Sequence, residues 1–168
     1  TGRRAGERAG SAAASATRTR DANAIWVSRR QTGNPVLKYI RNARWCFVDD
    51  LVPDYQMGSS TVCLFLSLKY HLLHPGYIHY RIRALQKAFR LRVVLVHVDV
   101  EDPVKPLASI TKLAILSDLT LICGWTYEEC ARYIETYRVY DQKKPDALHG
   151  RPGAAGQDYA SRVTSALT

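Results

Sequence analysis

The sequence lacks the features that mark membrane, secreted and zinc-stabilised proteins. None of its apolar runs approaches the roughly 18 residues that a membrane span needs, and no hydrophobic secretory segment follows its first residues. Its cysteines are far apart and include no pair with zinc-knuckle spacing: Cys46, Cys63, Cys123 and Cys130. We therefore expect no membrane partner, no structural zinc, and reduced thiols in a reducing compartment.

Acidic side chains are missing from a long central stretch. Between residues 55 and 98 there is no Asp or Glu, whereas Lys and Arg together occur six times. Metal-dependent cleavage of a phosphodiester needs two or more carboxylates held close together. The acids that flank the stretch include Asp54, Asp99 and Glu101. A nuclease built on these three is an alternative. However, "VDVEDP" at residues 98–103 is typical of a solvated turn, and we expect no metal and no cofactor.

Histidines are concentrated in the stretch "SLKYHLLHPGYIHYR", residues 67–81. His71, His74 and His79 are spaced by three and five residues, but Pro75 makes a shared helix face unfavourable. No carboxylate or thiol lies near them in the sequence. This pattern favours imidazoles at the surface or in the core over a metal site.

Positive charge exceeds negative charge along the chain, with a formal net charge of +9, and 46% of the residues are hydrophobic. The hydrophobic fraction and the length of 168 residues suit one domain with a short appendage. An excess of cations is typical of proteins whose partners carry phosphates. A basic surface without a specific role gives the same composition.

Composition divides the chain into four segments. Residues 1–22 have no large apolar side chain, which predicts a disordered basic tail whose arginines either attract nucleic acid or only keep it solvated. Residues 23–142 hold the apolar periodicity of a central domain. Proline and glycine in residues 143–156 predict a linker. Residues 157–168 read as the first helix of a further domain that the sequence does not continue.

Strand-like and helix-like spacing alternate in the central segment. Strands are predicted at residues 24–28, 45–55, 60–68, 91–100 and 119–125. Asn34 and Pro35 suit the cap and first residue of a helix. Thr126 and Glu129 form a capping box that opens a helix to about residue 140. The alternation predicts an α/β domain with helices covering a sheet.

Two further helices are predicted at residues 74–89 and 102–117. Their apolar residues recur at helical spacing and are expected to face the core: Ile78, Ile82, Leu85, Phe89, Leu107, Ile110, Leu113 and Leu116. Opposite this face, the first helix carries a predicted basic stripe of His79, Arg83, Lys87 and Arg90, while Tyr77 and Arg81 share its other flank. Such a stripe can follow a phosphate backbone, and exposed tyrosines can stack on bases or line a peptide groove. An ordinary solvated face gives the same spacing.

Four stretches together resemble the excision-repair cross-complementing group 1 family, the non-catalytic partners of the XPF nuclease. They are "SRRQTGNPVLKYIRN", "VPDYQMGSSTVCLFLSLKYHLLHPGYIHYRI", "LRVVLVHVDVEDP" and "ARYIETYRVYDQKKPD". The sequence looks most like plant or algal members. The resemblance implies an α/β fold of the nuclease type, similar to restriction endonucleases, with a mixed sheet flanked by helices and a degenerate active site. It also implies that the family's tandem helix-hairpin-helix domain, which pairs with XPF, is missing after residue 168.

The resemblance also implies a binding groove at the former active site. Where the XPF-type nuclease carries Gly-Asp and Glu-Arg-Lys motifs, this sequence has Pro53-Asp54 and Ser67-Leu68-Lys69. In the family, the groove accepts a glycine-rich, aromatic-containing peptide of an XPA-type scaffold, and the same domain binds single-stranded DNA. Asn34 is then either a helix cap or a groove contact, and Lys69 stands where vertebrate members carry Arg. The implied groove residues are Arg30, Asn34, Asp54, Phe65, Ser67, Lys69, Tyr70, Leu73, His74, Tyr77 and Arg81.

We therefore expect a non-catalytic, nuclear DNA-binding and scaffold subunit of a structure-specific endonuclease. Its processes would be nucleotide excision repair and interstrand cross-link repair. Its expected partners are an XPF-type nuclease, an XPA-type peptide, and single-stranded, junction or damaged DNA, with DNA contacts from His79, Arg83, Lys87 and Arg90. Two other classes stay open: a nuclease using Asp54, Asp99 and Glu101, and a protein-interaction module without a DNA role.

Overall fold

The computed structural model describes residues 21–85 and 87–143. Their strands form one six-stranded sheet in the order β2-β1-β3-β4-β5-β6. The strand bounds are β1 Ile25–Ser28, β2 Trp45–Val48, β3 Tyr55–Gln56, β4 Thr61–Ser67, β5 Leu91–His97 and β6 Thr120–Gly124. The helices are η1 Arg29–Gln31, η2 Pro35–Tyr39, α1 Leu68–Leu73, α2 Tyr77–Ala84, α3 Val104–Leu116 and α4 Tyr127–Gln142.

The sheet is mixed. Strands β4, β5 and β6 run parallel, β1 and β2 are parallel to each other, and β3 is antiparallel to both of its neighbours. In the register of the parallel part, Ser67 lies beside His97, and His97 lies beside Gly124. The carboxyl ends of β4, β5 and β6 therefore lie side by side at one edge of the sheet. In open α/β sheets this is the edge where ligands bind.

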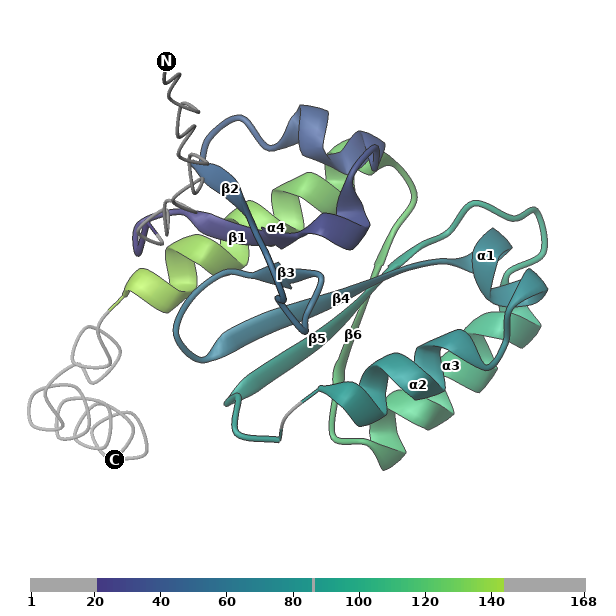
Figure 1. The fold of residues 1–168 in the computed structure, drawn as a ribbon. Helices are drawn as coiled ribbons and strands as arrows, with labels where there is room; N and C mark the ends of the chain where they lie inside the picture. The colour runs from purple at the N-terminus through teal and green to yellow at the C-terminus, as the bar shows by residue number, and fades with distance from the viewer. Residues whose placement is uncertain (1–20, 86, 144–168) are drawn as a thin grey trace, which may run out of the picture.

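Helices cover both faces of the sheet and divide the core into two clusters (Figure 1). On one face, α2 and α3 pack on the central strands through residues such as Leu64, Ile78 and Ile110. On the other face, α4 and η2 pack through residues such as Tyr55 and Ile134. Two covered faces explain why β4 and β5 are almost continuously apolar.

Most of the predicted elements are confirmed. Asn34 caps η2, because its side chain accepts a hydrogen bond from the Val36 amide at 3.0 Å, although the segment is a 3-10 helix. Thr126 and Glu129 form the predicted capping box of α4. The single strand predicted at residues 45–55 is wrong, since β2 and β3 are separated by a loop in which Asp50 has a φ of 58°. The predicted tail, linker and final helix lie outside the described residues, except for positions 21, 22 and 143.

The helix predicted at residues 74–89 is too long. Helix α2 ends at Ala84, and Leu85 follows in extended conformation with its amide donating to Arg81 and Ile82 carbonyls. Leu85 and Phe89 still pack on the α2–α3 core, as predicted, although both lie after the end of the helix. The prediction that Leu116 faces the core is also wrong, because its side chain is 77% exposed at the end of α3. The predicted buried strand at 119–125 is β6, an edge strand that is only partly buried.

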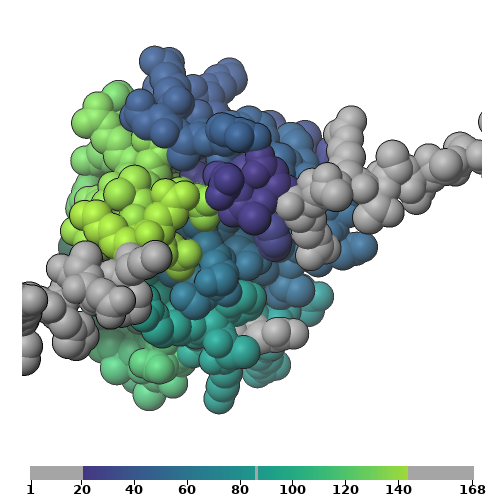
Figure 2. All heavy atoms as spheres, turned by 90° about the vertical axis from the view of Figure 1, so that its left-hand side faces the viewer, coloured from purple at the N-terminus to yellow at the C-terminus, as the bar shows by residue number. Residues whose placement is uncertain are grey.

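The two ends of the described chain lie side by side. Figure 2 shows the first residues next to the end of α4, and Arg138 of that helix donates to the Ala22 carbonyl at 3.2 Å. The same guanidinium donates to the Met57 carbonyl at 2.8 Å, which joins the helix to the end of β3. Within residues 21–85 and 87–143, no helix has the length and apolar character to cross a membrane.

Candidate functional site

Asp54 and Arg81 form a buried ion pair beside the start of β3. Arg81 Nη2 lies 2.9 Å from Asp54 Oδ1, and the two side chains are 2% and 1% exposed. The second carboxylate oxygen of Asp54 accepts the Phe65 backbone amide of β4 at 2.8 Å. Both oxygens are thus occupied by donors of the protein itself, and neither residue offers a free surface to a ligand.

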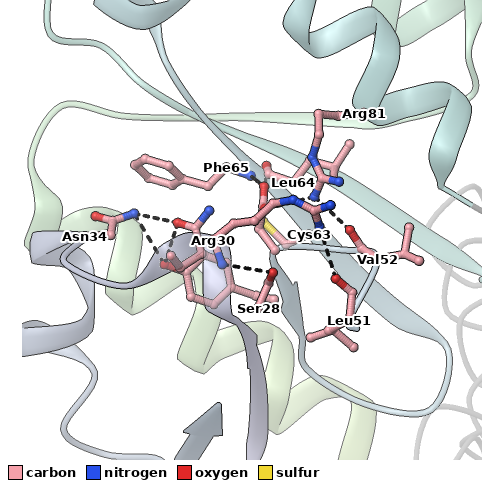
Figure 3. Close-up of polar contacts among 12 residues, drawn as sticks. Ser28, Arg30, Asn34, Leu51, Val52, Cys63, Leu64, Phe65 and Arg81 are labelled. Atoms are coloured by element: carbon pink, nitrogen blue, oxygen red, sulfur yellow. Dashed lines mark hydrogen bonds and ion pairs between the residues drawn. The ribbon is translucent and has the colours of Figure 1, made fainter. Parts of the chain in front are cut away.

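Two arginines hold the loop between β2 and β3. Arg81 donates from Nη2 to the Val52 carbonyl at 2.7 Å, and Arg30 donates from Nη1 to the Leu51 carbonyl at 3.4 Å. In Figure 3 both guanidinium groups approach this loop, Arg81 from α2 and Arg30 from η1. Two of the predicted groove residues therefore hold this loop in place.

The surroundings of Asp54 do not suit a divalent cation. Burial raises the pKa of this carboxyl, while Arg81 and the Phe65 amide lower it. Within the described residues, no group of three His, Cys, Asp or Glu side chains is placed to hold a metal ion. Glu101 is exposed, and Asp99 is engaged by the start of α1. The structure therefore does not bring the three acids of the nuclease alternative together as a ligand set.

The start of α1 is fixed by a serine and an aspartate. Ser67 caps the helix by accepting the Tyr70 amide at 3.3 Å, and it also bonds to Asp99 Oδ2. Asp99 Oδ1 accepts the Lys69 amide at 2.8 Å. Ser67 therefore has a structural role at the carboxyl end of β4.

Tyr70, His74 and Tyr77 form an aromatic cluster between α1 and α2. The ring of Tyr70 lies 4.6 Å from that of His74 and 5.1 Å from that of Tyr77, with the tyrosine rings edge to face. Tyr70 is 42% exposed, and Leu73 beside it is 72% exposed. Burial, then the nearby Asp54 carboxyl, raises the pKa of Tyr77, so its hydroxyl stays protonated at neutral pH. This aromatic cluster offers flat apolar surfaces at the molecular surface.

A second aromatic row, which sequence reasoning missed, runs from Phe65. His97 of β5 lies 6.4 Å from the Phe65 ring, and Tyr127 at the start of α4 lies 4.4 Å from His97. Phe65 and Tyr127 are partly exposed, whereas His97 is 7% exposed and its Nδ1 has no hydrogen-bond partner among the described residues. The sequence signal that could have indicated this row is His97, a polar residue at the end of an apolar strand and two positions before Asp99.

Asn34 is occupied by structural bonds. Besides capping η2, it donates from Nδ2 to Gln31 Oε1 at 2.8 Å and to the Tyr55 hydroxyl at 3.4 Å. Figure 3 draws these bonds of Asn34 as dashed lines. Arg30 and Lys69, in contrast, have exposed side chains. The predicted groove residues thus divide into a buried frame and an exposed set, and their binding roles stay predictions.

The predicted basic stripe is not one helix face. His79 and Arg83 lie on α2, but Lys87 and Arg90 follow its end and precede β5. All four side chains are exposed. The helical spacing that relates them in the sequence therefore does not set their relative positions.

A sequence profile described as the binding domain of DNA repair protein Ercc1 (rad10/Swi10) matches residues 22–144. The match covers the whole sheet and its helices. The chain belongs to this family. The predicted family resemblance is confirmed.

Relatives of the Ercc1/rad10/Swi10 family match most of the chain. It is 55% identical over 150 residues to DNA excision repair protein ERCC-1 of Arabidopsis thaliana, covering 89% of this chain and 36% of that protein. It is 45% identical over 147 residues to the mating-type switching protein swi10 of Schizosaccharomyces pombe, covering 88% of this chain and 57% of that protein. The chain thus spans between about a third and three fifths of the length of these relatives.

Solved structures confirm the predicted nuclease-type fold of this Ercc1 family member. XPF from Aeropyrum pernix superimposes with a TM-score of 0.62 at 14% identity, over 71% of this chain and 62% of that chain. XPF from the same organism in complex with DNA gives a TM-score of 0.58 at 15% identity, over 85% and 80% of the two chains. At these identities the likeness concerns the fold alone.

Proposed function

We propose that this chain is a DNA-binding part of a repair endonuclease subunit that does not itself cut. In this proposal the exposed aromatic cluster and the cations near it bind single-stranded DNA at junctions and damaged sites. An XPF-type subunit cuts the DNA, in nucleotide excision repair and interstrand cross-link repair, and the place of action is the nucleus. The family and the relative named as a DNA excision repair protein support this assignment.

The observation that carries the proposal is the state of Asp54. A nuclease carboxylate must face a metal ion and the substrate, together with further hard oxygen ligands. Asp54 instead points into the protein, is 1% exposed and is neutralised by Arg81. The neighbouring surface has aromatic rings where a metal centre would need acids. Rings and cations bind single strands by stacking and phosphate contact.

A tyrosine pair variant tests the DNA surface. We expect Tyr70→Ala with Tyr77→Ala to weaken binding of a labelled oligothymidine by about 1–3 kcal/mol per stacked base, because the exposed Tyr70 ring lies edge to face with the partly buried Tyr77 ring. The salt dependence should stay near that of the wild type, since no cation is removed. Fluorescence anisotropy at several salt concentrations measures both quantities.

Tyr80 provides the matched control. It lies on the same helix as Tyr77 and is 65% exposed, but no ring contact joins it to the aromatic cluster within the described residues. Tyr80→Ala should bind as the wild type does. Equal losses in both variants would place the DNA elsewhere, and no binding by the wild type would contradict the proposal.

Incubation with metal ions tests the nuclease alternative. With magnesium or manganese and a bubble substrate, we expect no cleavage by the purified chain, because Asp54 is paired internally and Asp99 holds the start of α1. Denaturing gels of end-labelled DNA measure the products. Cleavage that is lost in Asp99→Asn and in Asp54→Asn would overturn the non-catalytic assignment.

A short peptide of an XPA-type scaffold is the second candidate ligand. Leu73 is 72% exposed beside Tyr70, and an apolar side chain so placed suits an aromatic peptide better than a phosphate backbone. We propose that peptide and single strand share the aromatic cluster and therefore compete. Displacement of labelled oligothymidine by a synthetic glycine-rich aromatic peptide tests this, and simultaneous binding of both would separate the two sites.

A further inference from the structure

Three cations meet in an open hollow on the α2–α3 side of the sheet. The hollow has a volume of about 720 Å³, and Arg83, Lys87 and Arg92 line it together with Asp118. Figure 1 shows α2 and α3 ending close to the beginning of β5, which is where these residues come from. We call Arg83, Lys87 and Arg92 the basic hollow.

Arg92 is the buried part of the basic hollow. It is 8% exposed, and its Nη2 donates to the carbonyls of Ser117 at 2.8 Å and Asp118 at 3.3 Å. The end of a helix carries partial negative charge on its carbonyls, so Arg92 compensates the end of α3. Arg83 and Lys87 are exposed and have no hydrogen bond or ion pair with other residues in the described parts of the chain. Their charge is therefore available to an anion.

Apart from Ser117, the remaining lining of the hollow is apolar. Ile82 and Leu85 come from the end of α2, and Leu116 from the end of α3. Leu116 is 77% exposed, which a purely structural role in the core does not explain. A surface that combines cations with apolar side chains suits a phosphate joined to a sugar better than a free inorganic anion.

We propose that the basic hollow binds one backbone phosphate of a DNA strand and that Arg83 and Lys87 share this phosphate. The inference rests on the proposed DNA-binding function and adds a second contact to the aromatic cluster. Helix α2 connects the two sites: from Tyr77 to Leu85 the rise of about 1.5 Å per residue gives a separation of about 12 Å. One strand can thus reach both sites with a few nucleotides between them.

A double variant distinguishes a shared phosphate from a stripe of separate contacts. For a single strand, each lost phosphate contact lowers the slope of log K against log salt by about 0.7. We therefore expect Arg83→Gln with Lys87→Gln to lower the slope by about 0.7, whereas two separate phosphates would give about 1.4. The probe is a labelled oligothymidine of about ten nucleotides, within known site sizes, and the protein is the whole chain.

The matched control removes two cations from the opposite face. Lys38 of η2 and the nearby Arg41 are exposed on the α4 side of the sheet. Lys38→Gln with Arg41→Gln changes the net charge equally and should leave the slope unchanged. Arg92 is not substituted, because its bonds hold the end of α3.

A variant with increased affinity gives an independent readout. Asp118 lines the hollow and has a φ of 56°, a conformation that Asn tolerates well. Asp118→Asn should bind the oligothymidine several-fold more tightly, because it removes a negative charge beside the phosphate. Asp50 has a φ of 58° in the β2–β3 loop, so Asp50→Asn makes the same change in the same conformation outside the hollow and should have a smaller effect.

The outcomes separate this proposal from the one on which it rests. If the wild type does not bind the oligothymidine, both proposals fail. If it binds, and the double variant loses about 1.4 in slope or loses nothing, the shared phosphate is wrong while DNA binding stands. A loss of about 0.7, together with tighter binding by Asp118→Asn than by Asp50→Asn, supports the basic hollow.

Discussion

Replacing Arg81 by leucine should destabilise the fold by about 3–5 kcal/mol, because it leaves a buried carboxylate without its counter-charge. Arg81 lies 2.9 Å from Asp54, and both side chains are almost fully buried. The variant also loses the bond to the Val52 carbonyl, which holds the loop between β2 and β3. Chemical denaturation followed by tryptophan fluorescence measures the free energy of unfolding.

The stability loss caused by Arg81→Leu should depend on pH. Burial raises the pKa of Asp54 in the folded protein, so keeping this carboxyl ionised at neutral pH lowers the free energy of unfolding. This cost decreases as the pH falls through the folded pKa, because the carboxyl then becomes protonated. Without Arg81 the pKa rises further. The stability difference between the variant and the wild type should therefore shrink as the pH is lowered from neutral.

Asp54→Asn combined with Arg81→Leu is the control. The amide oxygen of Asn can still accept the Phe65 backbone amide, and no buried charge is left. This double variant should recover most of the lost stability. If it is as unstable as Arg81→Leu alone, then packing or the Val52 contact, rather than the unpaired charge, is the cause.

The second large effect is expected at Glu135 of α4. Its Oε1 accepts the amides of Arg41 at 2.7 Å and Asn42 at 3.0 Å, and its Oε2 accepts the Asn42 side chain at 3.0 Å. Glu135→Ala should cost about 2–3 kcal/mol, because hydrogen bonds to a buried charged group are lost together. The measurement is again the free energy of unfolding by denaturant.

Two variants of the same helix calibrate this result. Glu135→Gln keeps one acceptor oxygen and should lose less than the alanine variant. Glu128→Ala removes a carboxylate that is 57% exposed and pairs with Arg132 at 2.7 Å, and such a surface pair should change stability by less than about 1 kcal/mol. An equal loss for Glu128→Ala and Glu135→Ala would show that the buried bonds to the 41–42 turn do not matter.

The sequence predicted correctly those features that depend on neighbouring residues, such as helix caps. The caps at Asn34 and Thr126 act within three residues, and the structure confirms both. The apolar strands β4 and β5 are recognisable because both of their faces are covered. The end of α2 was not predictable from spacing, since Phe89 packs on the same core from outside the helix.

The geometry of the candidate site was not predictable from the sequence. The resemblance to the family placed Asp54 and Arg81 in one groove, but nothing in a separation of 27 residues shows that they form a buried pair. His97 and Arg92 were missed because each lies in a strand that the apolar pattern already explained. Pairing across elements is a property of the tertiary fold, and a single sequence contains it only indirectly.

The division of the core decides where the chain can be shortened. A fragment that stops before Thr126 would still contain every strand of the sheet. It would lack Cys130, Ala131 and Ile134, which close the core on the α4 face, and it would leave Ile25 and Val27 open to water. Strand content is therefore a poor guide to a minimal binding fragment, whose boundary must lie beyond Ile134.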